Sequence, residues 1–399
     1  MIKKIFPILA LAMFSSNLGM GIVAPLLPIY AQGKGADGIW IGLVVSSYAI
    51  ANIVSTPLFG RLSDRKGRKV FLTLGLLFYS LISLSYIFAG SVPVLAMVRL
   101  LHGAAGGMVL PIASACIGDV APSGQEGKWM GYSTAAFYGG FGAGPLIGGV
   151  MSQYLGMTAT FSFMAGLNFL AFLIVLFFLP NTAPKPAHGL AAPRPAFKTI
   201  LKSETVRGLF SYQIAAAIGQ GSFTAFIPIL ASARGMSLTL IGILIAATMS
   251  LMSLMGPVAG VVADRFNKRI LIVVGSLVII SALALVPSSG SFWQILLLAV
   301  TMALGAGMAM PSVSALSVTE GRKFGMGSTM GLISMGMSVG FAVGPVAAGE
   351  IVDFTSASFA FYFGSSAVAL GLVPFLWYTR RNSQPVGKLD IIKNENDGI

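Results

Sequence analysis

The stretch GRLSDRKGRKV, from Gly60 to Val70, carries six ionisable side chains in eleven residues, although only 9% of the whole chain is charged. Residues 39–60 before it and residues 70–90 after it are apolar runs of about 20 residues, the length that crosses a bilayer core roughly 30 Å thick. A short basic segment between two such runs is typical of a loop on the cytoplasmic side of a membrane. The stretch therefore predicts an integral membrane protein and marks one of its cytoplasmic loops.

Apolar runs of similar length recur along the rest of the 399 residues, of which 56% are hydrophobic, and the mean hydropathy is +0.87. A soluble domain of this size could not bury so much apolar surface, so we expect the surrounding medium to be lipid. The expected fold class is all-α integral membrane, with twelve transmembrane helices. The expected spans are 5–30, 39–60, 70–90, 92–116, 129–152, 158–180, 206–231, 238–262, 270–287, 291–315, 325–349 and 357–379.

The formal charge of +13 comes from basic residues that are spread over many short loops, which argues against a nucleic-acid partner. If the N-terminus lies inside, nearly all Lys and Arg fall in cytoplasmic segments. The exceptions are Lys34 and Arg234 in outer loops and Arg99 within a span. The positive-inside rule explains this distribution. We therefore expect a multi-pass protein of the cell inner (plasma) membrane with both termini in the cytoplasm.

The sequence matches itself at an offset of 200 residues: Gly19 aligns with Gly219 and Pro57 with Pro257, and the offset holds through six spans. Two halves of six spans share one orientation, which makes a pseudo-symmetric parallel repeat that suits a transporter working by alternating access. We expect a monomer with a six-helix bundle at 1–180, a cytoplasmic linker at 181–205, a second six-helix bundle at 206–380 and a cytoplasmic tail at 381–399.

The basic loop also contains Asp64, and a loop that only sets the orientation in the membrane does not need an acid. The equivalent position of the second half, 200 residues later, is also an acid, Asp264. A carboxylate can accept hydrogen bonds at a helix N-terminus, so the loop is expected to latch the two halves at the cytoplasmic side. The alternative is a solvated basic turn that only fixes topology. Gly60 and Gly67 are expected to permit a tight turn between the two spans.

Four motifs resemble signatures of the major facilitator superfamily. GRLSDRKGRK resembles its cytoplasmic loop signature, and LGMGIVAPLLP (Leu18–Pro28) resembles the first-span signature of its drug-exporting branches. RLLHG (Arg99–Gly103) resembles a fourth-span signature, and GYSTAAFYGGFGAGPLIGG (Gly131–Gly149) is similar to the fifth-span antiporter motif. In this order, over essentially the whole chain, the motifs resemble the twelve-span drug:proton antiporter family.

The resemblance implies secondary active transport with protons as a coupling partner. In that family the loop acid contacts the start of span 11, and a loop arginine joins a relay with the acid that ends span 4. The chain departs from the family pattern at Glu126, where an arginine is usual. The cytoplasmic gate expected on this sequence consists of Gly60, Asp64, Arg65, Gly67, Arg68, Asp119, Asp264 and Arg265.

Glycines recur every four residues in the fifth span and again in the eleventh. Such a ridge of small residues lets another helix lie close, and a proline within it adds a kink. The ridge is expected either to serve generic close packing or to form a tight, bent seam that seals against ion leak. The expected packing residues are Gly131, Gly140, Gly144, Pro145, Gly148, Gly149, Gly344 and Pro345.

Arg99 is the one charge expected well inside a span. A charge in lipid costs about 2.5 to 3.5 kcal/mol, so it is expected to face a wet cavity or a partner, with a snorkelling structural residue as the alternative. His102 shares its helix face, and a histidine can titrate near neutral pH, although a packing histidine is the plainer interpretation. The expected substrate and proton pathway consists of Arg99, His102, Asn17, Tyr48, Gln213, Gln220 and Phe223.

Carboxylates are expected only near the ends of the spans, with Asp37, Glu350 and Asp353 toward the outer face. Without a deep acid to hold a cation, neutral or anionic amphipathic cargo is expected. Enzymatic chemistry is not expected. The GMSVG stretch (Gly336–Gly340) fits a hydrolase pattern but lacks the strand that a nucleophile elbow needs. With two His and one Cys, neither a metal site nor a cofactor is expected.

Three hypotheses of function remain open at this point. The first is a proton-linked exporter of small amphipathic drugs or metabolites. The second is a sugar or metabolite exporter or importer on the same scaffold. The third is a membrane receptor or assembly protein that transports nothing, which binding without proton movement in everted vesicles would indicate.

Overall fold

The computed structural model describes residues 2–120, 126–180, 197–324 and 326–380, and all the regular elements in these ranges are helices. They are α1 (Ile2–Gln32), α2 (Gly38–Lys66), α3 (Arg68–Phe88), α4 (Val92–Val120), α5 (Glu126–Tyr154), α6 (Gly156–Phe178), α7 (Phe197–Ile200), α8 (Glu204–Ala233), α9 (Leu238–Arg265), α10 (Lys268–Leu285), η1 (Val286–Ser288), α11 (Phe292–Phe324), α12 (Met326–Phe354) and α13 (Phe359–Thr379).

The helices have the length and the surface of membrane spans. Ten of those described are long and apolar enough to cross a bilayer, and Leu238–Met252 within α9 is a shorter apolar helix. Large apolar side chains cover their outer surfaces, such as Phe177 on α6 and Leu370 on α13, which are 72% and 70% exposed. In water this exposure would be costly, whereas in lipid it is the expected solvent contact.

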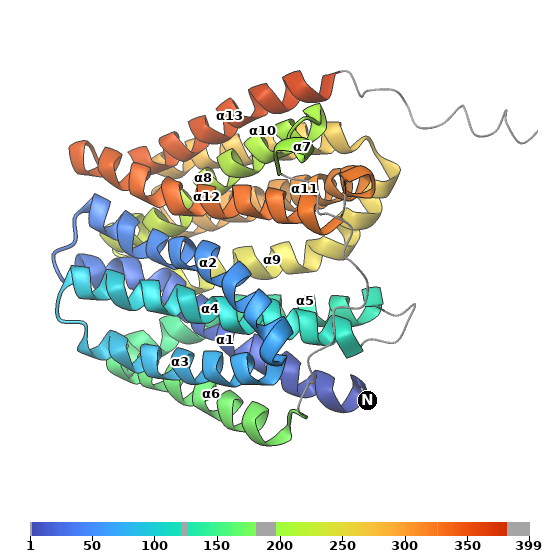
Figure 1. Cartoon of the computed structure of the whole chain (residues 1–399). Coiled ribbons are helices and arrows are strands. Elements are labelled where there is room, and N and C mark those ends of the chain that lie inside the picture. Colours follow the sequence, from blue (N-terminus) through green and yellow to red (C-terminus); the bar gives the residue numbers. More distant parts are fainter. Residues whose placement is uncertain (1, 121–125, 181–196, 325, 381–399) are drawn as a thin grey trace, which may run out of the picture.

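The helices fall into two halves that repeat the same order. Figure 1 shows α1 to α6 gathered on one side and α8 and α10 to α13 on the other, with α2 and α12 side by side where the halves meet. Each long helix of the first half has a counterpart about 200 residues later, so α2 corresponds to α9 and α5 to α12. The predicted fold class, two pseudo-symmetric six-helix bundles in a membrane, is confirmed.

The helices run between two opposite ends of the molecule, which we call the Arg68 end and the Asp353 end. The Arg68 end carries the junction between α2 and α3 and the start of α8. The Asp353 end carries the α1–α2 connection and the end of α12. The N-terminal end of α1 lies at the Arg68 end, opposite the α1–α2 connection (Figure 1).

The loop prediction around Gly60 is wrong in one respect. The helix α2 continues to Lys66, so Gly60 is helical and makes no turn. Gly67 alone turns the chain, with φ +95°, a value that side chains rarely adopt, and its N–H donates to the carbonyl of Ser63. The apolar pattern ended the span early because the last turns of α2 are basic and extend beyond the apolar region.

The glycine ridge of α5 packs against α1. A Cβ added at Gly140 would collide with the carbonyl of Phe14, and one at Gly144 would collide with Leu18 and Gly21. The counterpart on α12 meets α8 in the same way, where Gly344 lies against Ile218. Close helix packing at the predicted ridge therefore holds within each half.

A different face of the same two helices forms the contact between the halves. On one seam, Gly42 of α2 lies against the backbone of Pro345, and on the other, Gly242 of α9 lies against the backbone of Pro145. The seams continue toward the Asp353 end, where Gly349 meets Gly38 and Gly149 meets Leu238. At all four glycines an added Cβ would strike backbone atoms of the other half, so the halves are in direct backbone contact there.

Candidate functional site

Arg99 is buried in the first half, with 3% of its surface exposed. The helix α4 aims it at α1 and α2: its Nη2 donates to Met20 Sδ at 3.5 Å, and its guanidinium lies over the Tyr48 ring, 4.8 Å from the centroid. A thioether is a weak acceptor. The Nε and Nη1 atoms of Arg99 have no hydrogen-bond partner among the described groups. The guanidinium thus retains unused donors in a buried place.

His102 lies one turn further along α4 and joins a group of tyrosines. Its Nδ1 is 2.9 Å from the hydroxyl of Tyr86, and its ring packs edge-on against Tyr79 at 4.4 Å between centroids. The hydroxyls of Tyr48 and Tyr79 are 3.2 Å apart. His102, Arg99 and Tyr48 therefore belong to one buried polar cluster, which we call the Arg99 cluster together with Tyr79 and Tyr86. Sequence reasoning missed these last two tyrosines.

The other predicted pathway residues are spread over α1 and α8. Asn17 is buried and donates to Met13 O at 2.7 Å in its own helix. Gln213 is buried on α8, and its Oε1 has no partner among the described groups. Phe223 packs in the core of the second half, with its ring 6.1 Å from that of Phe361. The pathway roles of these three residues remain predictions.

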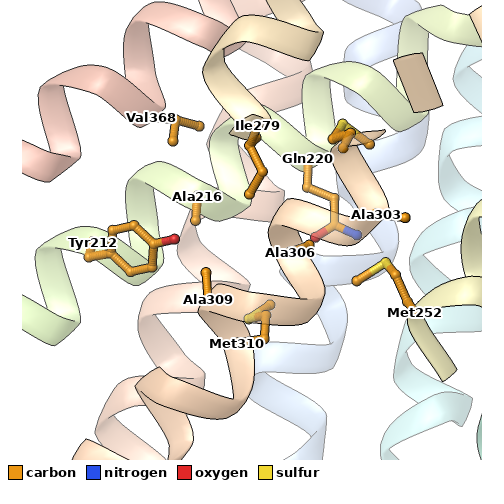
Figure 2. Close-up of a pocket in the computed structure, with 11 residues that line it drawn as sticks. Tyr212, Ala216, Gln220, Met252, Ile279, Ala303, Ala306, Ala309, Met310 and Val368 are labelled. Carbon is orange, nitrogen blue, oxygen red and sulfur yellow. The ribbon is translucent and has the colours of Figure 1, made fainter. Parts of the chain in front are cut away.

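Gln220 lines a pocket inside the second half. Figure 2 shows its amide directed between Ala303, Ala306 and Met252. The pocket measures about 30 Å³, which is room for about two water molecules. Its lining is almost wholly apolar, the other polar atom being the hydroxyl of Tyr212, which pairs with Ser276 Oγ at 2.8 Å. The full lining is Tyr212, Ala216, Gln220, Met252, Ile279, Met302, Ala303, Ala306, Ala309, Met310 and Val368.

This pocket stands where the first half holds the Arg99 cluster. At the offset of 200, Met302 corresponds to His102, Ile279 to Tyr79 and Gln220 to Met20. Arg99 itself corresponds to Ala299. The polar cluster and the small apolar pocket are therefore two versions of one place in the repeated fold.

At the Arg68 end, part of the predicted gate comes together. The Nε of Arg68, the first residue of α3, lies 2.5 Å from Oδ2 of Asp119 in the last turn of α4. The predicted contact between the loop arginine and the acid that ends span 4 is present. Arg65 is exposed in the last turn of α2. The side chains of Asp64, Asp264 and Arg265, together with position 131, lie outside the described residues, and their roles remain predictions.

A second acid at the same end was not predicted. Glu320 of α11 is 4% exposed, and it accepts hydrogen bonds from Ser203 Oγ and Lys323 Nζ, both at 2.7 Å. Ser203 is the N-cap residue of α8, so this acid fixes the start of that helix. The second half thus has its own polar contact at the Arg68 end, and this contact joins the end of α11 to the start of α8.

The seams carry polar contacts that sequence reasoning also missed. On the α2–α12 seam, the Asp353 carboxylate accepts from Gly38 N at 2.5 Å and from Ile39 N at 2.8 Å. On the α5–α9 seam, Gln153 Oε1 accepts from Thr239 N at 3.1 Å. In the sequence, these contacts are indicated only by the internal repeat. Its offset of 200 residues aligns Gln153 with Asp353, near the ends of the two glycine ridges.

Comparison with known proteins gives relatives along nearly the whole chain. An uncharacterized MFS-type transporter of Methanocaldococcus jannaschii is 28% identical over 379 residues, covering 94% of this chain and 98% of the relative. The quinolone resistance protein NorA of Staphylococcus aureus is 27% identical over 367 residues, covering 88% and 90%.

Solved structures share the fold at lower identity. A bacterial homolog of the human lysosomal transporter Spinster matches with a TM-score of 0.77 at 15% identity, over 94% of both chains. The nucleoside transporter NupG matches with a TM-score of 0.78 at 15% identity, over 94% of this chain and 99% of that one.

A model of one protein family matches residues 9–319 and, in a second match, residues 209–395. The two matches start 200 residues apart, which is the offset of the internal repeat. Among the described residues, no three metal-binding side chains gather. With the paired bundles, the glycine seams and the relatives above, this match shows that the chain is a transporter, not an enzyme, and that it belongs to the Major Facilitator Superfamily.

Proposed function

We propose that this transporter is a proton-coupled exporter of small amphipathic drugs or metabolites whose polar group is neutral or anionic. Cargo moves by alternating access as the two halves tilt about the seams between them. The positive-inside distribution supports a cytoplasmic Arg68 end and an outer Asp353 end, in a prokaryotic plasma membrane. The unit of transport is proposed to be a monomer, because one chain contains both halves.

The observation that carries this proposal is that Arg99 is buried and has donor atoms without hydrogen-bond partners among the described groups. A buried guanidinium with two unused donors stabilises an incoming anion or carbonyl more than any fully paired arginine could. A cationic cargo would instead meet like charge in a low-dielectric place, which costs free energy. The described carboxylates, all near helix ends, offer such a cargo no counter-ion inside the spans.

Two further observations support amphipathic cargo. The second half offers an apolar lining with the single amide of Gln220, which suits the apolar part of a molecule whose polar group lies toward Arg99. The pocket of about 30 Å³ is too small for a drug, so cargo would widen it by moving Met252 or Met302. The likeness to a quinolone resistance protein supports export of an aromatic acid of that kind.

The test uses everted vesicles with an acidified lumen and a dye that reports luminal pH. A quinolone, a neutral amphipath and a cationic dye are added in turn. The first two are expected to make the lumen more alkaline as they enter in exchange for protons, and the cation is expected to do so much less. Arg99→Ala is expected to reduce the quinolone response by at least about tenfold, the order of one charge-assisted hydrogen bond.

The matched control is Arg207→Ala. Arg207 also stacks on a tyrosine, 4.6 Å from the Tyr378 ring, and also has an unpartnered Nε among the described groups, but it lies at the start of α8. This variant is expected to keep the response. Silence with every cargo in the wild type, or equal responses from Arg99→Ala and Arg207→Ala, would contradict the proposal.

A further inference from the structure

The start of α10 places two cations beside the end of α13. Lys268 and Arg269 are the first two residues of α10, and both are partly exposed. The Nη2 of Arg269 donates to the carbonyl of Leu376, in the last turn of α13, at 3.0 Å. Figure 1 shows α13 along the outer edge of the second half, with this turn at the Arg68 end. The two cations therefore lie on the outside of the transporter, where the spans reach one surface of the membrane.

The equivalent place in the first half balances its charge with an acid of its own. Lys268 corresponds to Arg68, and the Nε of Arg68 lies 2.5 Å from Oδ2 of Asp119. The position equivalent to Asp119 is Thr319, which has no charge. The scaffold is thus the same in both halves, but the acid that faces this cation is present in only one of them.

The neighbouring acid of the second half does not replace the missing one. Glu320 follows Thr319, but it is buried and accepts hydrogen bonds from Ser203 Oγ and Lys323 Nζ. Among the side chains that the structure describes, no carboxylate pairs with Lys268 or Arg269. An anion from outside the chain would balance here what the first half balances internally.

The surface that leads from these cations toward the middle of the membrane is apolar and exposed. On α10 it consists of Ile270, which is 60% exposed, followed by Val274 and Leu277. On α13 it consists of Trp377, which is 66% exposed, and Val373 one turn earlier. Spacings of three and four residues place each set on one side of its helix. A tryptophan near the end of a span is typical of the headgroup level of a bilayer.

We propose that Lys268 and Arg269 bind the phosphate of an anionic phospholipid whose acyl chains lie along the exposed sides of α10 and α13. A phospholipid has a charged group at the membrane surface and apolar chains within the membrane, which matches the order of cations and apolar side chains found here. The guanidinium can give parallel hydrogen bonds to two phosphate oxygens, and the ammonium adds a point charge. Such a lipid would join the start of α10 to the end of α13 from outside.

This site is independent of the proposed cargo. It lies on the outer surface of the second half, whereas the Arg99 cluster lies inside the first half. It needs only that the Arg68 end meets a membrane surface, whichever side of the membrane that is. A failure of the vesicle assay would therefore leave the lipid site untouched, and the loss of the lipid site would leave the proposed cargo untouched.

The test measures lipid binding to the purified full-length chain by native mass spectrometry. The protein in a neutral detergent is equilibrated with equal amounts of phosphatidylglycerol and phosphatidylcholine of the same chain length, the second deuterated so that the two differ in mass. Each basic side chain beside an anionic headgroup changes binding about fivefold, so two are expected to favour phosphatidylglycerol about thirtyfold as the first bound lipid. Equal binding of the two lipids by the wild type would overturn the proposal.

Three variants assign the preference to this place. Lys268→Gln combined with Arg269→Gln removes both charges and is expected to abolish the preference. Thr319→Asp gives the second half the acid that the first half has, and by pairing with Lys268 it is expected to lower the preference about fivefold while both cations remain. Arg269→Lys keeps the charge and is expected to keep most of the preference.

The matched control is Lys3→Gln combined with Lys4→Gln, which removes as many charges from exposed residues at the same end of the first half. It is expected to keep the full preference. A preference that survives the loss of Lys268 and Arg269, or that falls equally in the control, would overturn the proposal, because attraction to the basic end as a whole would then explain it. The two lipids compete for the same protein molecules, so a variant of lower stability still gives a ratio.

Discussion

The interior of the first half is polar where the interior of the second half is apolar, although equivalent helices of the repeat enclose the two interiors. Around Arg99 the first half places His102 and Tyr48, whereas the second half places Ala299, Met302 and Thr248 at the equivalent positions. In the first half the aromatic rings and the guanidinium pack against one another at this place. In the second half a small pocket remains beside Gln220.

The difference shows that the repeated scaffold does not need a charge at this place. Burying a charge costs several kcal/mol, and an apolar version of the same site is present 200 residues further along. Packing alone therefore does not account for Arg99. The proposed function places the polar group of the cargo toward the first half and its apolar part toward the second, and variants that make one half resemble the other test the difference between them.

The largest effect on stability is expected from Gly103→Ala. This variant gives the first half the residue that the second half has at the equivalent position, Ala303. The added Cβ would collide with the backbone carbonyl of Tyr48, so α2 and α4 would have to separate. Overpacking of this kind costs about 3 kcal/mol. Thermal unfolding of the purified protein should show a clear fall in Tm.

The matched control for this variant is Gly166→Ala on α6, where an added Cβ meets no atom within 4 Å. That change should leave Tm unchanged or raise it slightly, because alanine favours helix. If Gly103→Ala unfolds at the same temperature as Gly166→Ala, the close approach of α2 and α4 does not distinguish the two halves.

A smaller effect is expected from His102→Met, which copies Met302 of the second half. The hydroxyl of Tyr86 would lose its partner at 2.9 Å while remaining buried, which costs about 1 to 3 kcal/mol. Unfolding of the single variants and of the double variant with Tyr86→Phe completes a double-mutant cycle. The double variant should recover much of the loss, since no unpaired hydroxyl remains. Costs that simply add would show that the His102–Tyr86 contact contributes nothing to stability.

The helices and the repeat could be predicted from the sequence because both depend on local patterns. Apolar runs report the thickness of the bilayer, and the matching of Gly19 with Gly219 reports a duplication. The contact of Arg68 with Asp119 was expected from a family resemblance. The end of α2 was misjudged at Gly60 because the helix outlasts the apolar run by more than one turn.

The contacts between the halves could not be predicted, because they depend on how two separate bundles meet. Asp353 appeared only as an acid near the outer end, and nothing local shows that it caps α2, a helix more than 300 residues earlier. The pocket could not be predicted either, because residues such as Ala306 and Met302 are equally common in tight helix packing and in the lining of a cavity. Phe223 was grouped with Gln220, but Phe223 packs near the ring of Phe361, whereas Gln220 lines the pocket.

The smallest effect is expected from Ala306→Val, which fills the pocket of the second half. Two added methyl groups gain about 0.8 kcal/mol each on burial, and the β-branched side chain loses about 0.5 kcal/mol in a helix, so the free energy of unfolding should rise by about 1 kcal/mol. Ala306→Ser, which adds little volume, serves as the control and should bring no gain. At the equivalent place in the first half, Gly106→Ala drives a Cβ against the Tyr48 hydroxyl and should lower Tm. Opposite signs for these two changes would establish that one half has spare room and the other has none, whereas a fall in Tm for Ala306→Val would mean that the space beside Gln220 is already filled in the native protein.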